Sequence, residues 1–315
     1  MGNRNTVAIT KVSQDRAFYK IIIRNILRKV LKSDTFRKIF LIMAGKDSYK
    51  SLEDWIEKYQ SNGRLTFSLT EAQRSFENNS ESALKQALDR LSKKGKIISV
   101  FKGFYVIVPA QYSAKGILPA TMFIDALMKS LDRKYYVALL NAAAFHGSSH
   151  QQPQEYFVIT EYPVLRTTNK RGVKINYIST KQLPPETLTE KKKTETGYII
   201  VSNPVLTALD LINYQKRIGG INRAATVINE LLERTKPGDF KDELIKYASA
   251  SSLQRLGFIL DEVLNRKQLA DRLFTLSKKA GTKFYLIPLR PSEKKGDGII
   301  NEKWKLRINT EIEID

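Results

Sequence analysis

Residues 63–109 constrain the fold of this chain most strongly, because two short helical patterns are followed there by two strand patterns. Ser80 is a suitable N-cap for the second helix, and the apolar residues of that helix recur at the spacing of one helix face. These residues are Leu84, Ala87, Leu88 and Leu91. The two strand patterns meet at Lys102-Gly103, a short turn of the kind that closes a β-hairpin. This order predicts a winged helix-turn-helix for residues 46–111.

Local signals also mark the ends of the two helices that come before. Ser51 is placed to cap a helix that ends at Asn62-Gly63, a left-handed stop signal. A short strand is expected over residues 64–69. Thr70 and Gln73 have the spacing of a capping box, which predicts a helix over residues 71–77.

The polar face of the helix after Ser80 suits the major groove of duplex DNA, which a recognition helix enters while its apolar face holds it on the scaffold. Lys85 and Arg90 can bond guanine O6 and N7, and Gln86 can pair with adenine N6 and N7. Asn79 and Ser82 lie near the helix N-terminus, where backbone N–H groups suit a phosphate.

Lysines beyond this face extend the predicted DNA-binding surface. Lys93, Lys94 and Lys96 are placed for the phosphate backbone, and Lys102 for the tip of the wing. The predicted DNA-binding residues are therefore Asn79, Ser82, Lys85, Gln86, Arg90, Lys93, Lys94, Lys96 and Lys102. Asp89 lies on the same face and would repel phosphate. Winged helices also serve as protein-binding modules, so that alternative stays open.

The whole chain is basic, with a formal net charge of +21 at pH 7, which favours polyanionic partners. Residues 1–50 hold 12 Lys and Arg against 3 Asp and Glu. Within them, residues 15–42 have the pattern of a basic amphipathic helix that could lie on a membrane surface, on DNA or on the rest of the protein. We expect residues 1–45 to form a separate helical extension. Met43 would also make a natural start, so the role of residues 1–42 stays open.

The chain contains no cysteine, which excludes a disulfide framework and a zinc finger and fits a reducing compartment. No apolar run reaches the roughly 18 residues that a membrane span needs. The N-terminal residues lack the apolar core of a secretory signal. The sequence therefore predicts a cytoplasmic protein without a membrane span.

Residues 112–315 mix helical and strand patterns without regular alternation, which predicts a mixed α/β (α+β) domain. We expect helices over 118–131, 135–145, 221–234, 240–249, 252–264 and 267–279, and a further helix that starts at Ser202-Asn203-Pro204. Strands are expected over 156–160, 173–178, 198–201, 284–287 and 304–308, with surface loops at 186–197 and 291–301.

Signatures of catalysis are weak along the chain. His146 and His150 are four residues apart, but Gly147 breaks the helix between them, so we expect His146 to be a packed helix-end residue bonded to a carbonyl. No nucleophile elbow, P-loop or dinucleotide fingerprint is present. Asp125 and Glu155 would be the carboxylates of a metal-dependent nuclease, which remains the alternative function. We otherwise expect no catalytic residue, no metal and no cofactor.

Several segments of the chain resemble the AbiEi family of antitoxins from type IV toxin–antitoxin systems. They are LDRLSKKGKIISVFKGFYVIVPAQY at 88–112, ILPATMFIDALMKSLDRKYYVALLNAAAFHG at 117–147, SNPVLTALDLINY at 202–214, GGINRAATVINELLE at 219–233, LQRLGFILDE at 253–262 and WKLRINTEIEID at 304–315. Their order and spacing carry the resemblance, since none of them is a catalytic signature.

The resemblance implies a non-enzymatic bacterial antitoxin encoded in a two-gene operon that protects against phage by abortive infection. Its winged helix would bind inverted repeats in its own promoter and repress transcription. Its C-terminal domain would counter a toxin that resembles nucleotidyltransferases, with or without a stable complex. The DNA-reading role would fall on residues 80–94 and Lys102, and the neutralising role on residues 113–315.

Overall fold

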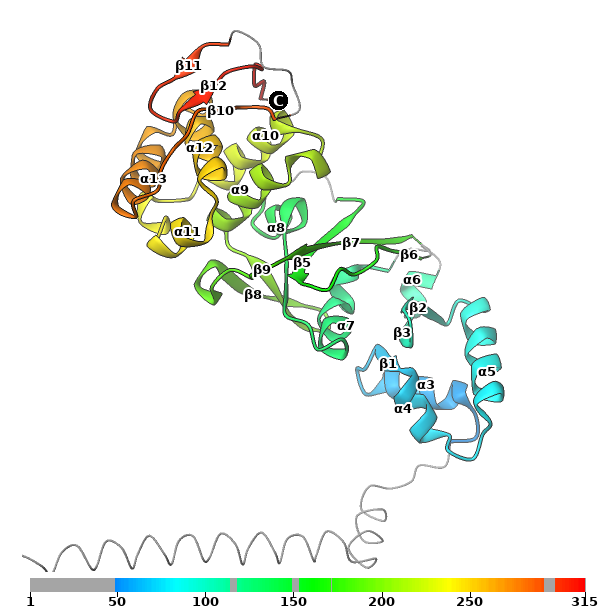
Figure 1. The fold of residues 1–315 in the computed structure, drawn as a ribbon. Helices are drawn as coiled ribbons and strands as arrows, with labels where there is room; N and C mark the ends of the chain where they lie inside the picture. The colour runs from blue at the N-terminus through cyan, green and yellow to red at the C-terminus, as the bar shows by residue number, and fades with distance from the viewer. Residues whose placement is uncertain (1–48, 114–117, 149–152, 171, 292–297, 315) are drawn as a thin grey trace, which may run out of the picture. The chain divides into compact units, whose positions relative to one another are not determined.

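A computed structural model describes residues 49–113, 118–148, 153–170, 172–291 and 298–314 (Figure 1). The predicted basic extension, residues 1–45, and His150 lie outside the described residues. The described part combines helices with three separate β-sheets, so the predicted mixed α/β fold class is confirmed. No helix in this part is long and apolar enough to cross a membrane.

The first described elements follow the predicted order of helices and strands. They are α3 (Leu52–Ser61), β1 (Thr66–Ser68), α4 (Leu69–Ser75), α5 (Glu81–Lys93), β2 (Ile97–Phe101) and β3 (Phe104–Ile107). Ser51 accepts a hydrogen bond from the Asp54 N–H at 3.1 Å, as a helix cap does, and Gly63 has a φ of +73°. The three strands form one sheet in the order β1-β3-β2. A winged helix-turn-helix has this order of elements, and we keep that name for residues 52–107 as our interpretation.

The predicted capping box at Thr70 and Gln73 is wrong, because α4 begins two residues earlier with Ser68 as its cap. The Ser68 hydroxyl accepts from the Glu71 N–H at 3.1 Å, and Glu71 accepts from the Ser68 N–H at 2.7 Å. Arg64 also donates to Glu71 at 2.7 Å. Partial burial alone would raise the pKa of Glu71, but the bonds from Ser68 and Arg64 lower it overall. The reciprocal bonds between Ser68 and Glu71 explain why the helix starts directly after Ser68.

A six-stranded mixed sheet in the order β6-β7-β5-β4-β9-β8 forms the centre of residues 118–202 (Figure 1). Its strands are β4 (Tyr135–Val137), β5 (Tyr156–Glu161), β6 (Thr168–Lys170), β7 (Val173–Thr180), β8 (Thr189–Thr194) and β9 (Gly197–Ser202). The pairs β5–β7 and β4–β9 are parallel, whereas β4–β5, β6–β7 and β8–β9 are antiparallel.

Both faces of this sheet are buried, and successive residues of one strand belong to different hydrophobic clusters. In β4, Tyr136 belongs to the cluster that holds the C-terminal helices, whereas Tyr135 and Val137 belong to the other. The second cluster also contains the β2–β3 hairpin residues Ile98, Val100, Phe104 and Val106. Thr168 of β6 donates to the Val100 carbonyl at 3.1 Å. The hairpin therefore packs on the central sheet, which fixes the position of the wing relative to it.

Two predictions about this region are wrong, because the place of a strand in the sheet decides which residues it contains. Residues 135–145 were expected to be one helix, yet they form β4 and then α8 (Leu139–Phe145), with Leu139 at a φ of +55°. A strand buried on both faces is a continuous apolar run and does not alternate. The expected loop 186–197 instead contains η2 (Glu186–Leu188) and β8, whose polar residues suit the edge of the sheet.

The expected helix over 118–131 is divided into η1 (Ala120–Met122) and α7 (Ile124–Ser130), which pack in the second cluster. A short helix α6 (Ala110–Ser113) precedes them. The strand β6 was not predicted, since its three residues are mostly polar and lie at the other edge of the sheet.

The remaining helices cover the first cluster as a compact group (Figure 1). They are α9 (Pro204–Asn213), η3 (Gln215–Arg217), α10 (Ile221–Leu231), η4 (Pro237–Asp239), α11 (Asp242–Tyr247), α12 (Ala250–Phe258), the π-helical turn η5 (Ile259–Val263) and α13 (Lys267–Lys279). A small sheet of β10 (Ile287–Pro288), β11 (Ile300–Asn301) and β12 (Leu306–Arg307) follows. Its strands are shorter than the predicted strands at 284–287 and 304–308, whereas α13 has the predicted bounds.

A carboxyl group lies in the middle of this group of helices. Asp210 of α9 is 1% exposed, and it accepts a hydrogen bond from the Tyr136 hydroxyl at 3.1 Å. Burial raises the pKa of Asp210 to about 8, because desolvation penalises the charged form more than the Tyr136 bond stabilises it. Burial also raises the pKa of Tyr136 well above its ordinary range, and the electrostatic interaction with Asp210 is the second cause of this shift. Asp210 is thus mainly protonated at neutral pH.

The raised pKa of Asp210 makes the stability of the protein depend on pH. Between the unfolded pKa, about 3.9, and the folded pKa, the folded state binds more protons, so the free energy of unfolding falls as pH rises. We expect Asp210→Asn to remove this dependence. The free energy of unfolding of the variant, relative to that of the wild type, should therefore be about 3 kcal/mol higher at pH 7.5 than at pH 5. Urea denaturation at both pH values measures it, with Asp132→Asn as the exposed control. An equal effect of Asp210→Asn at both pH values would contradict the assignment.

Candidate nucleic-acid interface

Helix α5 is held on the protein by one face and exposes the other. Leu84, Leu88 and Leu91 are buried at 5% exposure or less, and Ser80 caps the helix by accepting from the Ala83 N–H at 3.2 Å. The predicted DNA-binding residues all have exposed side chains: Asn79, Ser82, Lys85, Gln86, Arg90, Lys93, Lys94, Lys96 and Lys102. The face predicted to meet DNA is therefore turned away from the core that the leucines fill.

Two of the lysines on α5 form an ion pair with an acidic residue one turn earlier in the helix. Lys85 pairs with Glu81 at 2.6 Å, and Lys93 pairs with Asp89 at 2.7 Å. The pairing with Lys85 lowers the pKa of Glu81. Both pairs are exposed, so they are weak and a phosphate can replace the carboxylate as the partner of the lysine. Asp89, which we expected to repel phosphate, thus has a lysine beside it that offsets its negative charge.

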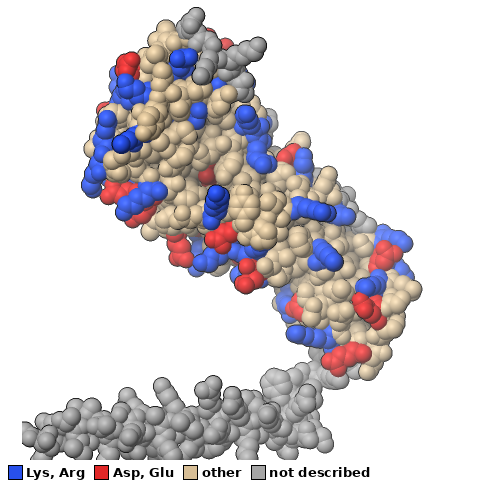
Figure 2. Space-filling view, viewed as in Figure 1, with Lys and Arg blue, Asp and Glu red and all other residues tan. Residues whose placement is uncertain are grey.

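Three other cations of this surface form no ion pair among the described residues: Arg90, Lys94 and Lys102. Figure 2 shows Lys and Arg side chains interspersed with Asp and Glu over the winged helix. The surface is therefore mixed in charge, with its unpaired cations at the C-terminal half of α5 and at the wing.

The wing is short and tied to the start of α4. Gly103 has a φ of +73°, which an L side chain rarely adopts, and its carbonyl accepts from the Leu69 N–H at 2.7 Å. This bond fixes the turn and leaves the Lys102 side chain exposed. In the sheet that contains the wing, Phe67 of β1 and Tyr105 of β3 stack with ring centroids 5.2 Å apart. The position of Lys102 is set by a rigid turn.

Sequence reasoning did not single out Arg74, which lies in the last turn of α4 and is exposed. The first helix of a helix-turn-helix crosses the DNA backbone, so a cation there suits a phosphate. The signal that could have found it is a basic residue just before the Asn78-Asn79 turn. We add Arg74 to the predicted phosphate contacts.

The residues considered for catalysis are engaged elsewhere in the structure. Asp125 pairs with Lys129 at 2.6 Å and accepts from the Tyr135 hydroxyl at 3.1 Å. Glu155 pairs with Lys174 and accepts from the Asn176 amide. Among the described residues, no group of three His, Asp or Glu side chains could hold a metal ion.

His146 is bonded to a carbonyl, as predicted. It is the C-terminal cap of α8, and its Nε2 lies 2.7 Å from the Ser202 carbonyl oxygen. A helix C-terminus favours a charged imidazole, but burial lowers the pKa of His146, although the Ser202 bond opposes the shift.

Comparison with known proteins identifies the class of the C-terminal part. Residues 136–262 match the family model of the AbiEi antitoxin C-terminal domain. This match confirms the predicted resemblance to the AbiEi antitoxin family for that segment and supports an antitoxin role. No curated protein matches the chain.

A solved structure shares the fold. The structure of RV2827C protein from Mycobacterium tuberculosis superposes with a TM-score of 0.58 at 13% sequence identity. The similarity covers 80% of this chain and 88% of that one. At this identity the likeness concerns the fold alone, and it extends beyond the segment that the family model matches.

Proposed function

We propose that this protein is a DNA-binding antitoxin that represses its own promoter through residues 46–111 and counteracts a nucleotidyltransferase-like toxin through residues 112–315. The observation that carries the DNA-binding part is the exposed polar face of α5, backed by three buried leucines and flanked by the wing. The match to the antitoxin domain at residues 136–262 supports the second part. The protein would act in the cytoplasm, without a cofactor of its own.

The chemistry of the α5 face fits the major groove. Lys85 and Arg90 present cationic donors suited to guanine O6 and N7, and Gln86 presents an amide suited to adenine. Lys94, Lys96 and Lys102 would contact phosphates, as would Lys93 once phosphate replaces Asp89 as its partner. Asn79 and Ser82 lie where the helix N-terminus favours an anion.

The promoter test measures binding of the full chain to the DNA upstream of its own gene and to shuffled DNA of equal length. We expect nanomolar-class affinity for the promoter, falling by about 10³ between roughly 50 and 200 mM salt if about six phosphates are contacted. Fluorescence anisotropy over a salt series measures it. Equal affinity for both DNAs at every salt concentration would reject sequence-specific repression.

The antitoxin test uses the gene that neighbours this one. If its product stops growth when expressed alone, co-expression of the full chain should restore growth. Failure to restore growth, with both proteins present at comparable levels, would reject the antitoxin role while leaving the DNA-binding result intact.

A further inference from the structure

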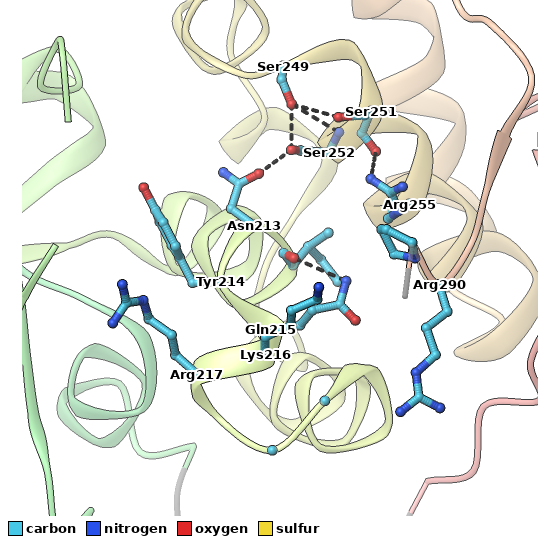
Figure 3. A pocket seen from close by; sticks show the side chains of 14 residues that line it. Asn213, Tyr214, Gln215, Lys216, Arg217, Ser249, Ser251, Ser252, Arg255 and Arg290 are labelled. Carbon is cyan, nitrogen blue, oxygen red and sulfur yellow. Dashed lines mark hydrogen bonds between the residues drawn. The ribbon is translucent and has the colours of Figure 1, made fainter. Parts of the chain in front are cut away.

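A cavity of about 720 Å³ lies among the C-terminal helices and is lined by several cations. Lys216 and Arg217 come from η3, Arg255 from α12, and Arg290 from the segment after β10. Figure 3 shows them around the cavity together with the serines that begin α12. No Asp or Glu is among the described residues that line it. Neither the DNA-binding surface nor the match to the antitoxin domain explains this composition.

Arg255 is a positioned cation that has no ion-pair partner among the described residues. Its Nε donates to the Leu289 carbonyl at 2.9 Å, its Nη2 to the Pro288 carbonyl at 2.9 Å, and its Nη1 to the Ser251 carbonyl at 3.3 Å. All three acceptors are neutral. Burial lowers the pKa of Arg255, because desolvation penalises its charged form. An anion in the cavity would supply the missing counter-charge.

Lys216 and Arg217 of η3 also line the cavity. Both side chains are exposed, and neither forms an ion pair within the described part of the chain. Two adjacent cations would ordinarily repel each other, and the nearby Arg255 adds to the repulsion. Lys216, Arg217 and Arg255 therefore bring positive charge to the cavity, and no carboxylate among the described lining residues offsets it.

Hydroxyl and backbone donors complete the lining. Ser249 caps α12 by accepting from the Ser252 N–H at 3.2 Å, and Ser249 and Ser251 lie with their hydroxyl oxygens 3.1 Å apart. Gly219 and Gly220 precede α10 with φ of +103° and +107°, and α10 has no side-chain cap. Uncapped N–H groups at a helix start are donors for an anion. These groups add directional hydrogen bonds to the charge of the cations.

We propose that this cavity, the cationic cleft, binds two or more phosphate groups of a small ligand, either pyrophosphate or the polyphosphate part of a nucleotide. Guanidinium groups bind phosphate through paired, charge-assisted hydrogen bonds, and serine hydroxyls and helix N-termini are its usual further partners. A volume of about 720 Å³ lies within the range of small-molecule sites, roughly 300–1,000 Å³. Tyr214 is half-buried in the lining, and its ring would give a nucleoside a surface to stack on.

The test is isothermal titration calorimetry of the full-length protein with pyrophosphate, with ATP and with adenosine, at constant ionic strength. We expect saturable binding of pyrophosphate and ATP and none of adenosine. Equal affinities for pyrophosphate and ATP would mean that the cleft recognises the phosphate groups only. A tighter complex with ATP would mean that the nucleoside contributes.

Two double variants show where the ligand binds. Lys216→Ala with Arg217→Ala removes two exposed cleft cations and should weaken binding roughly tenfold or more. Lys193→Ala with Lys246→Ala removes the same charge from exposed positions outside the cleft and should leave affinity within about twofold. The proposal is overturned if the wild type binds neither phosphate compound, or if both variants bind as the wild type does. Thermal unfolding of each variant verifies its fold.

Discussion

Replacing Lys85, Gln86 and Arg90 together by alanine should lower the affinity for promoter DNA by roughly 10²-fold or more and remove the preference for it over shuffled DNA. Each well-placed contact to a base edge discriminates by about 1–3 kcal/mol, and three are lost together. Lys94, Lys96 and Lys102 remain, so weak binding without sequence preference should persist. Anisotropy on promoter and shuffled DNA, at one salt concentration, measures both changes.

The triple variant should fold normally. All three side chains are exposed, and the pair between Lys85 and Glu81 is a surface pair that contributes little. Alanine is also the residue that favours a helix most, so α5 keeps its backbone and its buried leucines. A control with Arg234, Lys246 and Gln268 replaced by alanine removes the same residue types from exposed positions outside the winged helix.

The same variant separates the two proposed activities. Because residues 136–262 are unchanged, it should still restore growth in the presence of the toxin while failing to repress its promoter. If it binds promoter DNA like the wild type, α5 is not the recognition helix. If it loses the antitoxin effect as well, the two activities are not divided between the two parts of the chain.

Local sequence signals predicted the elements whose ends are set by neighbouring residues. The start of α5 follows from Ser80 as its cap and from the leucine spacing. The end of α3 follows from Gly63, which adopts a positive φ two residues after the helix. Pro204 after Asn203 likewise predicted the start of α9, where Asn203 accepts from the Leu206 N–H. In each case the interacting groups lie within four residues, so no knowledge of the tertiary fold was needed.

Elements that depend on distant partners could not be predicted in the same way. Strand β4 is apolar on both faces because it lies between two clusters, and β8 is polar because it lies at an edge. The burial of Asp210 arises only when α9 packs among the other helices. The cationic cleft brings together residues 216–217, 255 and 290, which the sequence separates by more than thirty positions in each step. Such groupings follow from tertiary packing.

Gly257→Ala should destabilise the C-terminal helices by about 3 kcal/mol or more, although the same change in an exposed helix usually stabilises it. A Cβ at Gly257 would lie 2.1 Å from Cζ3 and 2.2 Å from Cη2 of Trp304. Trp304 is fully buried, and its ring cannot easily withdraw, because its Nε1 donates to Asp261 at 3.0 Å. The ring also packs edge-on against Phe274, with centroids 5.4 Å apart. Relief of the clash therefore requires α12 to shift.

Urea denaturation compares Gly257→Ala with Gly238→Ala, where an added Cβ meets nothing within 4 Å and stability should change by less than about 0.5 kcal/mol. A second comparison uses Trp304→Leu, in which the space occupied by the indole is partly vacated. In that background Gly257→Ala should cost much less, since two residues in contact do not act additively. An unchanged cost there would mean that the clash with Trp304 is not the cause.

The contact between α12 and the C-terminal segment matters for the cavity too, because Arg255 of α12 is held by carbonyls of residues 288 and 289, which directly follow the start of β10. Gly257→Ala should consequently weaken pyrophosphate binding along with stability, whereas Gly238→Ala should change neither.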